Sequence, residues 1–269
     1  MPDKIEAIAK KTILEAGELI RQQIGRISRS SVHRKGPADY VTEVDKRCED
    51  LITTAIRHNF PDHHIMAEET ANDGLQDGYT WVIDPVDGTT NFIHGFPFVA
   101  VSIAVCLEKK PFLGLVLDPV RNELFSARSG DGAWLNGSRL PMRTKVDLDR
   151  ALIATGFPFR TREYIDVYLR AFKSIFLRVS AIRRAGAAAL DLAYLAAGRV
   201  DGFWEIGLKA WDIAAGALLI TETGGMISDF RGKDDHLING NVVAGVPLVY
   251  PFLIEQMQEH LVAALEARC

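Results

Sequence analysis

The residues best suited to chemistry in this chain follow a short apolar run, Trp81 to Ile83, which leads into two carboxylates, Asp84 and Asp87. Pro85 stands between them, and a residue before proline favours extended backbone, so we expect Asp84 at the end of a strand. Two carboxylates in such a turn can converge on a hard cation, which prefers oxygen ligands. The pattern therefore indicates a divalent-metal site.

A glycine and two hydroxyls come directly after the second carboxylate. Gly88 lets a ligand approach the backbone closely. If Thr89 and Thr90 open a helix, their amides offer a site for an anion. Asp, Pro, Gly and Thr are also ordinary turn formers, so a turn without metal is an equally good interpretation of this segment alone.

Two further acidic segments support the metal site. Glu68 and Glu69 follow an apolar stretch, and Asp212 stands at the expected start of an apolar helix. Each has a simpler interpretation: the glutamates as a solvated turn, and Asp212 as a helix N-cap. Acidic residues that end apolar elements far apart in sequence nevertheless suit a site assembled at the edge of a sheet.

The elements that must position these residues are of mixed type. Helical spacing of apolar residues over 5–24 and 42–60 is followed by several strands between 65 and 125, with residues 118–122 as a hairpin connection. After Pro141 strands and helices alternate, with strands over 152–155, 179–183 and 201–205 and helices over 164–175, 187–197 and 212–223. We expect an α+β chain with an N-terminal half, 1–140, carrying most metal ligands and an α/β half, 141–269, completing the site.

Composition limits the alternatives. The chain has 269 residues, 48% of them hydrophobic, enough for a large core, and its net charge of −4 gives no basic field for nucleic acid or membranes. Cys48, Cys106 and Cys269 lack the spacing of a zinc site or a disulfide framework, which fits a reducing cytoplasm. The charged N-terminus predicts no signal peptide, and the apolar stretch over 98–107 is too short to span a bilayer.

Taken together, these segments and several others resemble the inositol monophosphatase family over nearly the whole chain, and within it the bacterial SuhB-type branch. The resemblance rests on Asp39–Asp45, Ala67–Thr70, Trp81–Asn91, Ala154–Phe159, Arg183–Gly186, Trp204–Gly216 and Thr221–Gly225. It implies the layered α-β-α-β-α sandwich of the sugar-phosphatase fold, with the metal site between the halves.

The resemblance also implies a set of metal ligands. These are the carboxylates of Glu68, Asp84, Asp87 and Asp212 and the carbonyl of Val86. All are hard oxygen ligands, so Mg²⁺, two or three ions per site, is the natural choice.

The catalytic residues implied by the resemblance are Glu68, Thr89 and Asp45, with Thr89 and Asp45 pairing to polarise the attacking water. A structural alternative stays open for Asp45. Thr42 with an acid three residues later resembles a capping box at the start of the second helix.

The resemblance also implies a set of substrate contacts. They are Val86, Asp87, Gly88, Thr89, Arg183, Gly186, Ala187, Ala188, Glu205 and Asp212. Gly88 and Thr89 offer amides to the phosphate, and Glu205 accepts hydrogen bonds from polyol hydroxyls. Close helix packing is the alternative for the small residues 186–188, and plain solvation for Arg183.

The implied function is a cytoplasmic, homodimeric, lithium-sensitive phosphatase of inositol 1-phosphate and related small polyol and sugar phosphates. Lys209 and Ala187 replace a histidine and a threonine of the animal enzymes, which leaves the substrate open. The rivals are a phosphatase of 3′-phosphoadenosine 5′-phosphate or fructose 1,6-bisphosphate, and a regulatory partner of transcription antitermination complexes.

Overall fold

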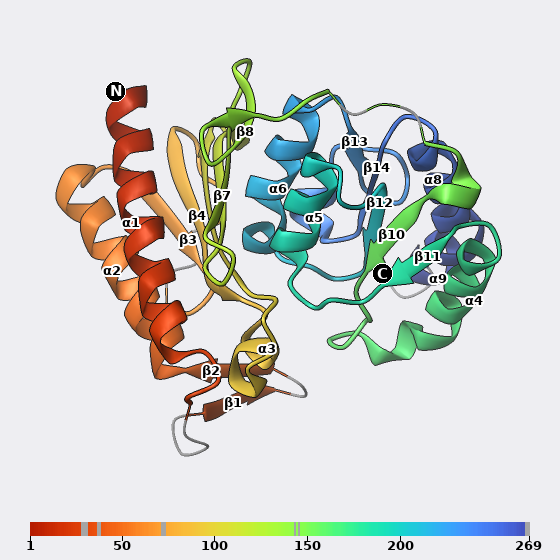
Figure 1. Ribbon diagram of the computed structural model, residues 1–269, viewed down its shortest axis with the longest axis horizontal. Coiled ribbons are helices and arrows are strands. Elements are labelled where there is room, and N and C mark those ends of the chain that lie inside the picture. The colour runs from red at the N-terminus through yellow and green to blue at the C-terminus, as the bar shows by residue number, and fades with distance from the viewer. Residues whose placement is uncertain (28–31, 37–38, 71–73, 143, 145, 267–269) are drawn as a thin grey trace.

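Two amphipathic helices form the outermost layer on the N-terminal side. The computed structural model describes residues 1–27, 32–36, 39–70, 74–142, 144 and 146–266. Within it, α1 (Pro2–Gln23) and α2 (Glu43–Asn59) lie side by side over one face of a sheet (Figure 1). Their apolar residues recur every three or four positions and are buried, as at Ile5, Ile13 and Ile20. Both predicted helices are confirmed.

The second layer is a seven-stranded sheet with the order β3-β4-β5-β6-β7-β8-β9. β3 and β4 are parallel and the other pairs are antiparallel. Its strands are β3 (His64–Ala67), β4 (Tyr79–Asp87), β5 (Ala100–Leu107), β6 (Lys110–Asp118), β7 (Glu123–Arg128), β8 (Gly132–Leu135) and β9 (Ser138–Arg139). The predicted hairpin connection over 118–122 joins β6 to β7, as expected.

Both faces of this sheet are covered. Along β4 the side chains of Trp81 and Ile83 enter the core under α1 and α2, while Val82 enters the core on the opposite face. Successive strand residues point to opposite faces, so a strand covered on both sides becomes a continuous apolar run. The unbroken apolar run before Asp84 is explained by this position.

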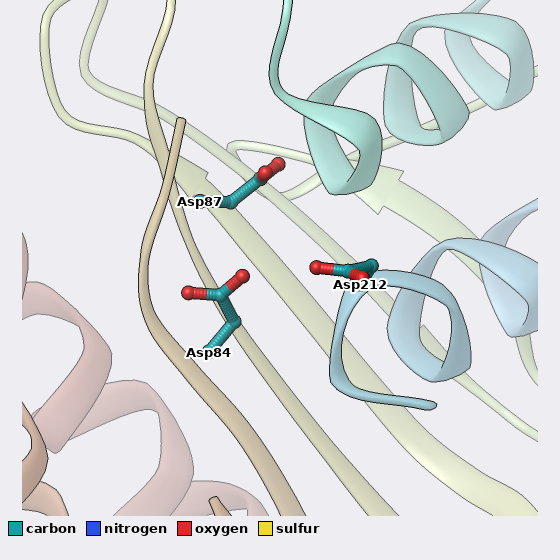
Figure 2. Close-up of side chains that lie close together, drawn as sticks. All are labelled: Asp84, Asp87 and Asp212. Carbon is teal, nitrogen blue, oxygen red and sulfur yellow. The ribbon is translucent and has the colours of Figure 1, made fainter. Parts of the chain in front are cut away.

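Two almost wholly buried helices, α5 (Ala188–Ala197) and α6 (Ala210–Glu222), form the middle layer. Small residues let them approach closely. A Cβ on Gly114 of β6 would lie 2.8 Å from the carbonyl oxygen of Ala215, and one on Gly216 would lie 2.5 Å from Leu192. The N-termini of both helices thereby come up to the end of β4 that carries the acidic residues (Figure 2).

A five-stranded mixed sheet and its covering helices complete the α-β-α-β-α sandwich, confirming the predicted fold class (Figure 1). Its order is β11-β10-β12-β14-β13. The strands are β10 (Leu152–Thr155), β11 (Ala181–Arg183), β12 (Gly202–Glu205), β13 (Met226–Ser228) and β14 (Val242–Gly245); the outer helices are α4 (Ile165–Phe176), α8 (Val249–Met257) and α9 (Ala263–Glu266). The strands and helices predicted between 152 and 223, including those that correspond to α5 and α6, begin and end within two residues of the observed bounds.

The smaller elements lie at the edges. They are the hairpin β1 (Val32–Gly36) and β2 (Asp39–Thr42), α3 (Thr89–His94), α7 (His236–Asn239), the 3₁₀ turns Leu148–Arg150 and Arg162–Tyr164, and a π turn, Gln258–Val262. The predicted division near residue 140 falls after β9, where the first sheet ends. One core nevertheless joins the halves, since Val82 and Phe125 share it with Leu192 and Ile213. No helix in the described part of the chain is long and apolar enough to cross a membrane.

Candidate active site

The first two carboxylates lie at one end of the strand β4. The strand does not stop at Asp84 as predicted: it continues to Asp87, and its pairing with β5 shifts register between these two residues. Such a bulge lets the backbone turn a side chain without leaving the sheet. The amide of Val86 donates to Oδ1 of Asp84 at 3.0 Å, which fixes this carboxylate.

The third carboxylate reaches the same place from α6. Oxygen atoms of Asp84, Asp87 and Asp212 all lie within 4.8 Å of one another, and the side chains point to a common space (Figure 2). Asp212 is not the N-cap that was considered for it. It stands in the first turn, where it accepts a 2.7 Å hydrogen bond from the amide of Lys209, the N-cap residue.

Burial makes this cluster difficult to ionise. It raises the pKa of Asp84 well above its usual value, and the nearby Glu68, Asp87 and Asp212 raise it further. Burial and then Asp212 raise the pKa of Asp87 to about 7, and burial also raises the pKa of Asp212. Bringing acids together out of water favours their neutral forms unless a cation compensates them. Three oxygen donors at this spacing, without a His or Cys, fit a hard divalent cation such as Mg²⁺.

The end of β4 and the turn after it contact residues 186–189, in the second half of the chain. Oδ1 and Oδ2 of Asp87 accept hydrogen bonds from the amides of Ala188 (3.2 Å) and Ala189 (2.8 Å) at the start of α5. Gly88 has a φ of +87°, and a Cβ there would lie 3.2 Å from the carbonyl oxygen of Gly186. Only glycine suits both the left-handed backbone and the close approach.

Glu68 lies beside Asp84, although it is not one of the three residues whose oxygen atoms all lie within 4.8 Å of one another. Its carboxylate raises the pKa of Asp84, and its Oε1 is 4.0 Å from Nη2 of Arg160. Glu49 of α2 forms hydrogen bonds with the loop after Glu68, and the Glu49 side chain is fully buried. The Glu49 carboxylate accepts from the amide of Glu69 at 2.8 Å and from the hydroxyl of Thr70.

Thr89 begins α3, the condition on which its amide was expected to serve an anion, and its hydroxyl lies next to Asp45 of α2. Oγ1 lies 3.2 Å from Oδ1 of Asp45 and 3.1 Å from the carbonyl of Val86. The other Asp45 oxygen accepts from both the amide and the hydroxyl of Thr42, the capping-box arrangement. The two interpretations of Asp45 are thus compatible, because each uses a different oxygen atom.

A cavity of about 350 Å³ opens over these groups. Its walls include the acidic cluster, the turn 88–91 and the segment 186–188, together with the aromatic and basic residues Tyr40, Phe157, Phe159, Arg160 and Arg184. Glu205 also lines it, with its carboxylate so close over Gly156 that a Cβ there would lie 1.9 Å from the carboxyl carbon. The cavity brings together the predicted residues Glu68, Asp84, Val86, Asp87, Gly88, Thr89, Gly186, Ala187, Ala188, Glu205 and Asp212.

Two predicted residues lie outside the wall of the cavity. Asp45 reaches it only through Thr89, and Arg183 is exposed, with Nη1 donating to the carbonyl of Ile182. The neighbouring Arg184 lines the cavity instead. Arg160, Arg184 and the positioning residue Glu49 were not found from the sequence. Neighbouring arginines look alike in one dimension, and the backbone at the end of β11 decides which one turns inward.

The sequence and the structure of this chain both match known proteins over nearly their whole length. The model of the inositol monophosphatase family matches residues 1–267. The Nus factor SuhB of Pseudomonas aeruginosa is 49% identical over 264 residues, covering 96% of this chain and 97% of that protein. A crystal structure of the SuhB protein of Bartonella henselae superposes with a TM-score of 0.90 at 36% identity, covering 96% and 100% of the two chains. The IMPase of Thermotoga maritima gives 0.86 at 34% identity, covering 97% and 98%.

Proposed function

Since the chain belongs to the inositol monophosphatase family, we propose that it is a magnesium-dependent phosphatase of small polyol and sugar phosphate monoesters, with inositol 1-phosphate among its substrates. The observation that carries this proposal is the convergence of three buried carboxylates with raised pKa values beside the turn at Gly88. A structural acidic cluster would leave such groups without compensation. A cation site explains why they are kept together.

Mg²⁺ would be held by Glu68, Asp84, Asp87 and Asp212 and by the carbonyl of Val86, with two or three ions per site. When bound, these ions neutralise the phosphate oxygens and favour attack by water on phosphorus. The amides of Gly88 and Thr89 orient the phosphate, and the Thr89 hydroxyl, polarised by Asp45, orients the water. Glu205 and the backbone at 186–187 contact the polyol, whereas the Ala188 amide is already bound to Asp87.

Metal-dependent hydrolysis of inositol 1-phosphate tests this proposal directly. Phosphate release should require added Mg²⁺, stop in EDTA, and be inhibited by Li⁺ through replacement of one magnesium ion. Asp84→Asn and Asp212→Asn should each lower kcat by several orders of magnitude. Full activity in EDTA would contradict the proposal.

We further propose that the enzyme acts in the cytoplasm as a homodimer. Cys48 and Cys106 are buried free thiols, which agrees with a reducing compartment, while Cys269 lies outside the described residues. Sedimentation at micromolar protein concentration tests the dimer, and a monomer alone at that concentration would contradict it.

A second function is suggested by the relatives named Nus factor SuhB. We propose that this chain also associates with transcription complexes. Pulldown with purified transcription elongation factors tests this association. Repeating it with the Asp84→Asn protein would show whether association depends on an intact acidic cluster.

A further inference from the structure

The side-chain amide of Asn91 forms hydrogen bonds with both halves of the chain. Its Nδ2 donates to the carbonyl oxygens of Phe98 at 2.8 Å and of Ala185 at 2.9 Å, and lies 3.3 Å from that of Gly186. A primary amide has two hydrogens, so the two shorter contacts account for both and the third contact shares one of them. Ala185 and Gly186 stand 94 and 95 residues further along the chain. One half-buried side chain of the cavity wall thus joins α3 to the second half of the chain.

Asn91 lies between two parts of the proposed substrate site. Three residues before it, Gly88 begins the turn that is expected to bind phosphate, and the carbonyls that Asn91 binds in the second half lead into the segment 186–188, which is expected to contact the polyol. Gly88 packs against the same carbonyls: a Cβ there would lie 3.1 Å from the oxygen of Phe98 and 3.2 Å from that of Gly186. The Asn91 hydrogen bonds therefore act where the two parts of the site are in contact.

The segment 186–188 is held at both of its ends. Asn91 binds carbonyl oxygens at its start, and Asp87 accepts hydrogen bonds from the amides of Ala188 and Ala189 at its end. The two links differ in one respect. The carboxylate of Asp87 is also an expected metal ligand, whereas the Asn91 amide is uncharged and is not among the expected ligands. Asn91 can therefore be replaced without removing a ligand of the ion.

We propose that Asn91 is a positioning residue that sets the spacing between the phosphate-binding turn and the polyol-binding segment. It thereby determines how well the site selects phosphates of polyols, while the reacting phosphate and the ions are held by other residues. This inference rests on the proposed phosphatase function and assigns part of its substrate selectivity to a residue outside the expected substrate contacts. When the spacing of two subsites changes, a ligand that spans both loses binding, and a ligand that fills only one does not.

Two other roles would give Asn91 a different signature. If it only held the two halves together, its loss would weaken the binding of every ligand. If it supported the turn at Gly88 alone, the binding of inorganic phosphate would suffer as much as that of the substrate. Inorganic phosphate fills only the phosphate side of the site, so its comparison with inositol 1-phosphate separates these roles.

The test measures KM and kcat for inositol 1-phosphate, and the inhibition constant of inorganic phosphate, in the magnesium-loaded enzyme. Asn91→Ala should raise KM about tenfold and change kcat and the phosphate inhibition constant less than about threefold, because the lost interaction contributes equally to the bound substrate and the transition state. Asn91→Leu, which fills a similar volume and cannot donate, should behave in the same way. Calorimetric titration with inorganic phosphate in Mg²⁺ measures the phosphate side without turnover.

Glu222→Ala is the matched control, because it also removes two side-chain hydrogen bonds between the halves. The Glu222 carboxylate accepts from the amides of Gly130 and Gly132 at 2.8 Å each, at the opposite end of α6 from Asp212. This variant should lower the melting temperature and leave the ratio of KM to the phosphate inhibition constant unchanged.

An unchanged KM in both Asn91 variants, or an equal rise in KM and in the phosphate inhibition constant, would overturn the positioning role. So would the same change of ratio in Glu222→Ala, because it would assign the effect to general cohesion of the halves. Thermal melting shows whether each variant is folded, and failure of both Asn91 variants to fold would give Asn91 a structural role instead. A wild-type enzyme that does not hydrolyse inositol 1-phosphate in Mg²⁺ would refute the proposed phosphatase function, and this inference with it.

Discussion

The hydroxyl of Thr89 lies 3.2 Å from Oδ1 of Asp45, although 44 residues separate them in the chain. Asp45 is almost completely buried in the first turn of α2, and burial raises its pKa. The hydrogen bonds from Thr42 and Thr89 oppose that shift and favour the carboxylate. Asp45 thus caps α2 with one carboxylate oxygen and orients the Thr89 hydroxyl with the other.

This pairing predicts that Thr89→Ala lowers kcat about 10²- to 10⁴-fold with little change in KM, since water orientation matters in the transition state. Thr89→Ser should keep most of the activity because it retains the hydroxyl. Steady-state kinetics on inositol 1-phosphate measure the effects on kcat and on KM separately. A large rise in KM with kcat intact would instead assign the Thr89 side chain to phosphate binding.

The raised pKa of Asp87 predicts how the stability of the metal-free protein depends on pH. The unfolded chain releases this proton near pH 3.8 and the folded protein only near pH 7, so between them the folded state binds more protons. Stability from this group is therefore fully present below pH 3.8 and lost as pH rises through about 7. In EDTA, Asp87→Asn should weaken the fall in melting temperature between pH 5 and pH 7.5.

Magnesium should remove this trend, because a ligand must lose its proton to bind the ion. The rise in melting temperature that excess Mg²⁺ gives over EDTA should therefore grow with pH over the same range, which leaves the wild-type melting temperature nearly independent of pH through this group, and Asp87→Asn should gain less from the ion. The same slope in EDTA for wild type and Asp87→Asn would show that Asp87 is already ionised in the metal-free fold.

The fully buried Glu49 predicts a positioning effect on Glu68. Glu49→Gln cannot accept from both the Glu69 amide and the Thr70 hydroxyl as the carboxylate does, so the loop after β3 should loosen. Binding of Mg²⁺, measured by calorimetry, should weaken about tenfold, while kcat at saturating Mg²⁺ changes less. Asp50→Asn, a charge removal at the next and exposed position, is the control. Unchanged Mg²⁺ affinity with a lower melting temperature would give Glu49 a purely structural role.

Much of this site follows from local patterns in the sequence, and the remainder depends on packing. Asp84, Asp87 and Asp212 each end or begin an apolar element, which is visible in one dimension. The continuation of β4 to Asp87 was not visible, since Pro85 normally ends regular pairing and a bulge here accommodates it. The role of Glu49 could not be predicted from local patterns, because its partners come from a loop 20 residues away.

Substrate-side residues were the least predictable. Lys209, which replaces a histidine of the animal enzymes, has an exposed side chain, and its amide donates a hydrogen bond to Asp212. Arg184, which lines the cavity, has an orientation that depends on Phe157, Phe159 and Gly186. Such an orientation arises from the meeting of three segments, and no periodicity in the sequence encodes it.

The contact between Gly156 and Glu205 gives the last prediction. A Cβ at Gly156 would lie 1.9 Å from the carboxyl carbon of Glu205 and about as close to both its oxygens, so Gly156→Ala must displace this carboxyl group. Because Glu205 is expected to contact the polyol rather than the phosphate, the substitution should raise KM for inositol 1-phosphate about tenfold with a smaller effect on kcat. A double-mutant cycle tests the route of the effect. In a Glu205→Ala background, where the clash is absent, Gly156→Ala should cost little more; additive losses would mean that it acts through the backbone of β10 instead.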